Sequence, residues 1–440
     1  MKTIDFQNPV IGIVAEYDPF HNGHTLHIAR ARKSLDNGRG NDAAVVIVLS
    51  SSFTQRGLPA MLDKWTRARM VLANGADLVL ELPFVYACNA GPEFARGAID
   101  TLAATGFVTH LSFGMETFYL KTTTLLADFS PENPVAVLDT IIDILIQEPL
   151  SFKSNLRKAL ASGMSYPKAL AQALDQELPG GGAFASMPNN ALALSYLLCV
   201  RRGNYGLIPL PVRREGAGYH DRASGPLASA TAIRSAVAAW VPKELGHTHD
   251  YEKSWIKEAM PPVALELLKE QGGRGRLCLG TEELWILLRG LLLRFSPEEL
   301  RKYAGMDEGL ENLFLKHYAK ANSYDDFVGR CVCARYTRNR IRRQTIRCLV
   351  GLDRWTAWNL SRLGPSYVRV LGYNERGRSL LRARASKESK NGNRTIPVVT
   401  RLAAAPGAMA DLEFRASRLR ELLLPCPDLR YEERHIPEHP

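Results

Sequence analysis

The feature that most constrains this 440-residue chain is an apolar run that leads directly into a histidine-rich turn. Val10 to Val14 precede Glu16-Tyr17-Asp18-Pro19-Phe20-His21-Asn22-Gly23-His24, and helical spacing continues from Thr25 to about Leu35. A strand, an H-x-G-H turn and a helix in this order gather imidazole donors, a permissive glycine and helix N-terminal amides around one point. Such donors suit a nucleoside triphosphate, because they stabilise the charge that develops during adenylyl transfer. The alternative interpretation is a histidine-rich turn with one buried, hydrogen-bonded imidazole.

Short apolar runs alternate with helical stretches through the first half of the chain, which favours an α/β fold with a parallel sheet. Five such strands fit an N-terminal doubly wound, Rossmann-like sheet, in which ligands bind outside the carboxyl ends of the strands. The H-x-G-H turn follows the first strand and therefore lies where a ligand is expected. The expected strands are Val10–Val14, Ala44–Ser50, Asp77–Leu82, Val108–Phe113 and Leu207–Val212, with helices at Lys64–Asn74 and Phe94–Ala104 between them.

Two breaks organise the rest of the chain. Residues 128–176 predict two or three helices that end at Pro179-Gly180-Gly181-Gly182, and a second break at 242–250 is expected to close the first domain. His247 and His249 lie in that second break, where an exposed pair is favoured over a metal site. We predict a nucleotide-binding catalytic domain at 1–245, a mainly helical basic domain at 250–425 and an irregular tail at 426–440.

The net charge of +11 is concentrated in one segment of the second half. Residues 331–401 contain 17 lysines and arginines against three acids, a net charge of +14. This arginine-rich stretch predicts a helix that packs one face and directs guanidinium groups toward phosphates, and its aromatic residues could stack on unpaired bases. RNA is therefore the favoured partner, and a solvated basic face is the alternative. The residues concerned are Arg330, Arg335, Arg338, Arg340, Arg342, Arg343 and Arg347, with Tyr336, Trp355, Trp358, Tyr367 and Tyr373.

Several classes of protein are disfavoured by composition. The seven cysteines are odd in number and form no C-x-x-C pair, which argues against a disulfide framework and a zinc site, so no metal ligands are predicted. No apolar run reaches the roughly 18 residues of a membrane span, and the first residues lack a secretory apolar segment. We expect a cytoplasmic protein.

A second phosphate-binding pattern occurs near the end of the first domain. Ser229-Ala230-Thr231-Ala232-Ile233-Arg234 places two hydroxyls and a guanidinium at the start of an expected helix. The hydroxyls could cap that helix and bind phosphate oxygens while Arg234 supplies charge, although a plain helix cap is the alternative. Together with the upstream H-x-G-H turn, the S-x-T-x-I-R pattern is typical of nucleotidylyltransferases.

The motifs of this chain, taken together, resemble those of the bacterial tRNA(Met) cytidine acetate ligases of the nucleotidylyltransferase superfamily. The Q-R-G, R-x-G-A-G-Y-H-D and arginine-rich elements are specific to this group, whereas H-x-G-H is shared with many adenylyltransferases. The matching stretches run in order over about residues 10–385: G-I-V-A-E-Y-D-P-F-H-N-G-H (12–24), F-T-Q-R-G-L-P-A (53–60), D-K-W-T-R-A (63–68), D-L-V-L-E-L-P (77–83), S-F-G-M-E (112–116), P-N-N-A-L (188–192), R-E-G-A-G-Y-H-D (214–221), S-A-T-A-I-R (229–234), R-Y-T-R-N-R-I-R-R (335–343) and L-G-Y-N-E-R-G (371–377).

The resemblance implies an enzyme that uses ATP to activate acetate as acetyl-adenylate and then acetylates the wobble cytidine of elongator tRNA(Met). Mg²⁺ is expected to accompany ATP. His21, His24 and Arg234 are the implied catalytic residues, and Gln55, Arg56, Arg335, Arg338, Arg342 and Arg343 the implied contacts to acetate, cytidine or tRNA. The implied ATP-binding positions are Ile13, Val14, Glu16, Tyr17, Pro19, Phe20, His21, Gly23, His24, His27, Gly114, Asn189, Arg214, Ser229 and Thr231.

Two departures from the family pattern and two rival functions accompany this interpretation. Asp18 stands where the family commonly has Asn and would add negative charge to the phosphate site, while Ser51-Ser52 replaces a usual Gly-Asn nearer the substrate pocket. One rival is a small-molecule adenylyltransferase, whose reaction would be insensitive to RNA. The other is a non-catalytic RNA-binding protein, which would release no pyrophosphate from ATP.

Overall fold

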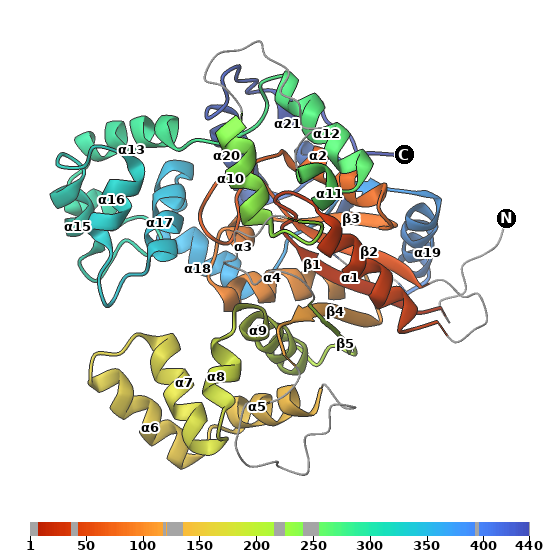
Figure 1. Ribbon diagram of the computed structural model, residues 1–440, viewed down its shortest axis with the longest axis horizontal. Helices are drawn as coiled ribbons and strands as arrows, with labels where there is room; N and C mark the ends of the chain where they lie inside the picture. Colours follow the sequence, from red (N-terminus) through yellow and green to blue (C-terminus); the bar gives the residue numbers. More distant parts are fainter. Residues whose placement is uncertain are drawn as a thin grey trace.

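A seven-stranded sheet with the order β5-β4-β1-β2-β3-β6-β7 forms the centre of the molecule (Figure 1). The computed structural model describes residues 8–36, 43–117, 120, 135–214, 225–240, 255–391 and 396–439. The five predicted strands are confirmed, with ends shifted by at most two residues. The strands are β1 Val10–Ala15, β2 Ala44–Ser50, β3 Leu78–Leu82, β4 His110–Met115, β5 Ile208–Arg213, β6 Val368–Tyr373 and β7 Val398–Val399.

The first five strands are parallel, as predicted. Ile13 of β1 lies opposite Ile47 of β2 on one side and Ser112 of β4 on the other. The chain adds β2 and β3 on one side of β1 and then β4 and β5 on the other, so the carboxyl ends of β1 and β4 form the switch point where α/β folds bind ligands.

The complete sheet is mixed, because two strands that were not predicted extend the five parallel ones. Strand β6 comes from the half of the chain expected to be mainly helical, and it pairs antiparallel with β3, with Leu78 opposite Tyr373. Residues 368–372 of this strand are buried, and they lie within the basic segment 331–401, for which no strand was predicted.

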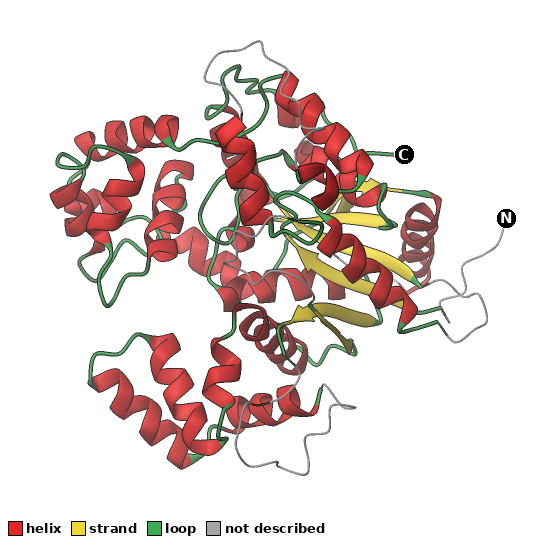
Figure 2. Cartoon of the chain, viewed as in Figure 1, coloured by secondary structure: helices red, strands yellow, loops and turns green. Residues whose placement is uncertain are grey.

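Alternate residues of the strands face two separate cores, since successive side chains of a strand point to opposite faces. Val46 and Leu80 belong to one core, and Ile47 and Val79 to the other. Figure 2 shows helices on both faces. The first core includes residues of α3 Phe84–Ala87, α4 Gly91–Ala104, α9 Pro188–Arg202 and α20 Gly407–Glu421; the second includes residues of α1 Asn22–Lys33, α2 Lys64–Leu72, α10 Ala230–Trp240, α11 Ile256–Ala259 and α12 Pro262–Gly273.

Two groups among the other helices extend to the same side of the sheet, one with α5 to α8 and one with α13 and α15 to α17, whereas α19 lies on the opposite side (Figure 1). Before the break at Pro179 the predicted two or three helices are three, α5 to α7, and the break is short because α8 begins at Gly181. Within the described ranges no helix is both long and apolar enough to cross a membrane. The helices not named above are α5 Ala136–Gln147, α6 Leu150–Ala161, α7 Tyr166–Glu177, α8 Gly181–Ser186, α13 Glu282–Arg294, α14 Pro297–Leu300, α15 Leu310–His317, α16 Tyr324–Cys331, α17 Arg338–Val350, α18 Arg354–Leu363, α19 Glu375–Asn391, the 3₁₀ helix Leu402–Ala404 and α21 Tyr431–Arg434.

Buried ion pairs join the two halves of the chain. The ammonium group of Lys64, at the start of α2, lies 3.1 Å from carboxylate oxygens of both Glu413 and Glu432 and also pairs with Glu81 of β3. Arg369 of β6 pairs with Glu81 and Glu432. All five side chains are at most 2% exposed, so residues from both halves share one desolvated charge cluster.

The structure tests only one of the two predicted boundaries of the second half. The break at 242–250, with His247 and His249, lies outside the described residues, so the division there stays a prediction. The tail from 426 was expected to be irregular, and that expectation is wrong for α21, which holds Glu432 in the charge cluster.

Candidate functional site

The H-x-G-H turn fixes both of its imidazoles through the backbone. His21 is the N-cap of α1, and its Nδ1 accepts a hydrogen bond from the Gly23 N–H at 3.1 Å. The Nδ1 of His24 accepts from the His21 N–H at 3.2 Å. Burial lowers the pKa of His21 to about 3 and holds the pKa of His24 well below its usual value, so both rings are neutral. A neutral ring whose Nδ1 accepts carries its proton on Nε2, and both rings therefore keep an Nε2–H donor for a ligand.

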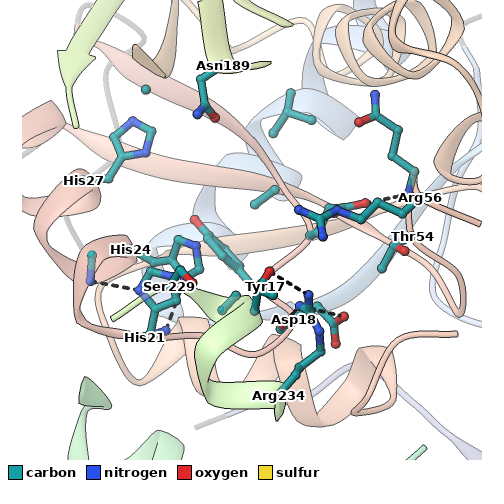
Figure 3. A pocket seen from close by; sticks show the side chains of 18 of the residues that line it. Tyr17, Asp18, His21, His24, His27, Thr54, Arg56, Asn189, Ser229 and Arg234 are labelled. Atoms are coloured by element: carbon teal, nitrogen blue, oxygen red, sulfur yellow. Dashed lines mark hydrogen bonds and ion pairs between the residues drawn. The ribbon is translucent and has the colours of Figure 1, made fainter. Parts of the chain in front are cut away.

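These histidines line a cavity of about 430 Å³ at the switch point of the sheet. In Figure 3, His21, His24 and Ser229 lie together on one side, with Arg56 and Thr54 on the opposite side. Pro19 and Phe20 do not line the cavity, and Phe20 instead packs edge-on against Tyr17 beneath it. The predicted ATP positions that do line the cavity are Ile13, Val14, Glu16, Tyr17, His21, Gly23, His24, His27, Gly114, Asn189, Arg214, Ser229 and Thr231, with Arg234, Gln55 and Arg56 beside them.

One wall of the cavity joins β4 to the start of α9. The Glu116 carboxylate accepts hydrogen bonds from the Asn189 side chain at 2.6 Å and from the backbone N–H groups of Asn189 and Asn190 at 3.1 Å, which caps α9. Arg214 donates to the Asn189 side-chain oxygen at 3.2 Å. A Cβ atom at Gly114 would lie 3.1 Å from the Arg214 side chain, so a larger residue here would require that side chain to shift. The sequence interpretation missed Glu116, although it ends the S-F-G-M-E stretch.

The opposite wall is the first turn of α10. The Ser229 hydroxyl accepts from the Ala232 N–H at 3.2 Å, as a helix cap does. Arg234 donates to the Thr231 hydroxyl at 3.1 Å and to the backbone carbonyl of Asp18, and it lies 3.3 Å from the Asp18 carboxylate. The Met61 N–H donates to the same carboxylate at 2.7 Å. The charge that Asp18 adds is thus balanced by Arg234, which Figure 3 shows reaching it.

The second departure, Ser51-Ser52, lies beneath the cavity and does not line it. Both residues are buried. The Ser51 carbonyl accepts a hydrogen bond from the Arg67 guanidinium, and the Ser52 carbonyl accepts one from the Ala60 N–H at 3.0 Å. Arg67 also donates to the Glu16 carbonyl at 2.7 Å and to the Leu62 carbonyl at 3.1 Å. This fully buried arginine, which the sequence interpretation did not select, holds three backbone segments under the site.

The Gln55-Arg56-Gly57 loop connects the cavity to the arginine-rich helix α17. The Glu16 carboxylate accepts from the Gln55 N–H at 2.6 Å, and burial raises the pKa of Glu16. From the other side, Arg343 donates to the Gln55 carbonyl at 3.0 Å. Gly57 has φ +72°, and a Cβ atom there would lie 2.3 Å from the Arg343 backbone nitrogen. The loop therefore needs glycine at this position to rest on α17.

The four arginines predicted to contact tRNA have different surroundings. Arg335 is exposed, and the Arg338 side chain is 49% exposed and 3.8 Å from Asp325. Arg342 is only 17% exposed and pairs with Asp325 at 2.9 Å, while Arg343 contacts the loop described above. Among the predicted aromatics, Tyr336 and Tyr367 are buried, so they offer no ring to a base, whereas Trp355 and Trp358 are exposed.

A segment of the second half also lines the cavity, and no sequence signal indicated it. Residues 278–281, between α12 and α13, lie on its rim, and the Cys278 N–H donates to the Met61 carbonyl at 2.9 Å. Burial raises the pKa of the Cys278 thiol to about 12, so it remains protonated. Across the described ranges, no three His, Cys, Asp or Glu side chains converge as metal ligands would.

The depressed pKa of His21 predicts a pH-dependent stability term. Above pH 6.5 the imidazole is neutral in both the folded and the unfolded protein. Between pH 6.5 and about pH 3 it is protonated only in the unfolded protein, so the folded form loses stability as the pH falls. Between pH 6.5 and pH 5 the wild-type chain should therefore lose about 2 kcal/mol of unfolding free energy relative to the His21→Asn variant, which has no imidazole to titrate. Urea unfolding of both chains at each pH measures this difference. A difference that is constant with pH would contradict a buried neutral His21.

Comparisons with known proteins agree with this geometry. A family model described as HIGH Nucleotidyl Transferase matches residues 8–434. The tRNA(Met) cytidine acetate ligase of Lysinibacillus sphaericus strain C3-41 is 32% identical over 94% of each chain. That of Halothermothrix orenii is 32% identical over 90% of this chain and 87% of its own. The crystal structure of Thermotoga maritima TmcAL bound with alpha-thio ATP superposes with a TM-score of 0.82 at 27% identity, over 98% of this chain and 99% of that one. The chain therefore belongs to the HIGH nucleotidyl transferases and, within them, to the tRNA(Met) cytidine acetate ligase family.

Proposed function

We propose that this chain activates acetate with ATP and acetylates the exocyclic amine of the wobble cytidine of elongator tRNA(Met). The observation that carries the proposal is the pair of neutral histidines, whose Nδ1 atoms are occupied by backbone N–H groups and whose Nε2–H groups remain for a ligand in the switch-point cavity. The names of the relatives, and the ATP analogue bound to the Thermotoga maritima protein, support the same reaction.

In the first step an acetate oxygen attacks the α-phosphorus of ATP, a P–O bond breaks and pyrophosphate leaves. His21 and His24 would donate to the triphosphate from one side, and Ser229, Thr231 and Arg234 from the α10 side. These donors are already fixed, so they stabilise the developing negative charge without reorganisation. Gly114 and Asn189 would leave room for adenosine beside β4. No protein nucleophile is needed, because positioning and charge stabilisation suffice.

In the second step the cytidine amine attacks the acetyl carbonyl carbon, AMP leaves with the bonding electrons, and the amine loses a proton. Gln55 and Arg56 would orient acetate and cytidine, because their loop lines the cavity and rests on α17. The arginine-rich helix is thereby attached to the wall of the reaction site. A tRNA substrate implies the cytoplasm as the place of action.

The residues of the cavity do not suit a resident Mg²⁺ ion. The two carboxylates that line it are engaged, Glu16 by the Gln55 N–H and Asp18 by the Met61 N–H and Arg234. Mg²⁺ favours carboxylates together with substrate phosphates, so the ion expected with ATP would enter on the triphosphate.

Incubation of the protein with ATP, labelled acetate and tRNA tests this function. Nucleoside mass spectrometry should find labelled acetylcytidine at the wobble position, and the protein should catalyse acetate-dependent exchange between ATP and pyrophosphate. Exchange that neither needs acetate nor leads to tRNA acetylation would instead favour a small-molecule adenylyltransferase. The absence of any pyrophosphate release would favour the non-catalytic RNA-binding alternative.

The exposed arginines should contribute to tRNA affinity through phosphate contacts. Charge reversal of Arg335 and Arg338 is expected to weaken tRNA binding and to reduce the slope of log K against log salt by about one per lost contact. Arg342 is unsuitable for this test because only 17% of its side chain is exposed. Filter binding at several salt concentrations gives the slope, with Arg430→Glu, whose side chain is 80% exposed, as the control. An unchanged slope in the double variant would contradict the assignment.

A further inference from the structure

Helix α18 exposes two tryptophans side by side, which the packing of the protein does not explain. The exposed fractions are 76% for Trp355 and 52% for Trp358, whereas Trp65 and Trp285 are buried. The two ring centroids are 6.4 Å apart with an interplanar angle of 82°, so the edge of one indole faces the other. Large exposed aromatic surface usually marks an interaction site, because its burial within a protein is strongly favourable.

Four arginines, Arg96, Arg347, Arg354 and Arg362, lie around these rings. The Arg362 guanidinium lies 4.8 Å from the centre of the Trp358 ring. Trp358 also lines a hollow of about 280 Å³ together with Arg96, Arg347 and Arg354. The acids nearby are Glu93 in the same hollow, Asp100 at 3.5 Å from Arg96 and Asp307 at 4.0 Å from Arg354, together with Asp353, whose carboxylate caps α18 and accepts from Thr356. An aromatic platform among arginines suits unpaired bases and their phosphates better than it suits an apolar protein partner.

This surface adjoins the main cavity. Consecutive residues of α4 line the two hollows, Phe94 the main cavity and Glu93 the hollow beside Trp358. Helix α17 also reaches both hollows. Arg343 contacts the Gln55 carbonyl beside the main cavity, and Arg347, one helical turn later, lines the second hollow. Helix α18 is fixed to α3 and α4, because Tyr86 donates to the Leu360 carbonyl at 2.8 Å and Arg96 to the Arg362 carbonyl at 3.0 Å. Figure 1 shows α18 beside these helices and below α17.

We propose that Trp355 and Trp358 stack on an unpaired nucleotide of the RNA substrate next to the cytidine that enters the main cavity. This inference rests on the proposed function and adds to it a second contact with the same RNA. Arg354 and Arg362 neutralise the phosphates of that nucleotide. The stacking makes the enzyme prefer a cytidine in a single-stranded loop over one in a duplex, since paired bases offer no free face.

Alanine and phenylalanine replacements of each tryptophan test the proposal. Loss of a base–aromatic stack typically costs about tenfold in affinity. We expect Trp355→Ala and Trp358→Ala each to weaken binding of an anticodon stem-loop RNA about tenfold with an unchanged salt slope, and the phenylalanine variants to retain most of the affinity. Leu150→Ala, at a position 88% exposed on α6, is the control. Acetate-dependent exchange without RNA verifies that the ATP cavity of each variant is intact.

Wild-type affinity of the alanine variants for the stem-loop would overturn the proposal. So would equal weakening for a fully paired RNA, or a change in sedimentation that showed the tryptophans to join two copies of the chain. Failure of the proposed function is a separate result, because it would appear in the unmodified protein as missing acetylcytidine.

Discussion

Replacement of His21 or His24 by alanine is expected to lower the rate of acetyl-adenylate formation by about 10²–10³-fold, the usual cost of removing one preorganised donor to developing charge. Each ring is a neutral Nε2–H donor whose other nitrogen is occupied by the backbone. Acetate-dependent exchange between ATP and pyrophosphate measures the effect without RNA.

The double role of His21 requires a second variant. Its Nδ1 also caps α1, and loss of an N-cap costs about 1 kcal/mol. Asparagine can accept the same backbone N–H but has no group in place of Nε2–H, so His21→Asn should preserve stability and still lose the rate. His110→Asn is the matched control, because His110 is the first residue of β4 and does not line the cavity. Near-normal exchange by His21→Asn would show that the imidazole donor does not act on the triphosphate.

Replacement of Lys64 by methionine is expected to lower the free energy of unfolding by about 3–5 kcal/mol, because it breaks a buried ion cluster. Burial alone would lower the pKa of Lys64, but Glu413, Glu432 and Glu81 outweigh it and keep the ammonium charged. Without that charge, three buried carboxylates would share Arg369. Urea unfolding at neutral pH measures the loss.

A surface pair provides the control for this prediction. Lys153 and Glu148 form an ion pair at 3.2 Å, but both side chains are nearly half exposed. Exposed pairs of this kind contribute at most about 1 kcal/mol. Lys153→Met should therefore change the unfolding midpoint little. Burial and the charge of Glu81 raise the pKa of Glu413 to about 7, so Glu413 is the carboxyl expected to take up a proton in the Lys64 variant. Equal shifts for both lysine variants would refute the cluster as a major source of stability.

Local patterns of residues were enough to predict the strands and helices around the phosphate turn and the chemistry of that turn. Strand β1, the H-x-G-H turn and α1 follow one another within 25 residues, and their apolar period, glycine and histidines act on near neighbours. The S-x-T-x-I-R turn was found for the same reason, since Ser229 caps the helix that begins at the next residue. The quoted motifs also identified the family, because they occur in order along the chain.

Which of these groups contact one another depends on the packing of segments that lie far apart in the chain. Arg234 balances Asp18 across 216 residues, Arg343 reaches the Gln55 loop across 288, and Lys64 meets Glu413 across 349. Strand β6 was likewise hidden, because its pairing with β3 depends on residues almost 300 positions away. Local spacing carries no information about such pairs. Their charges and hydrogen-bonding groups are brought together by the packing of the sheet and helices, where a buried polar group is stable only with its partner.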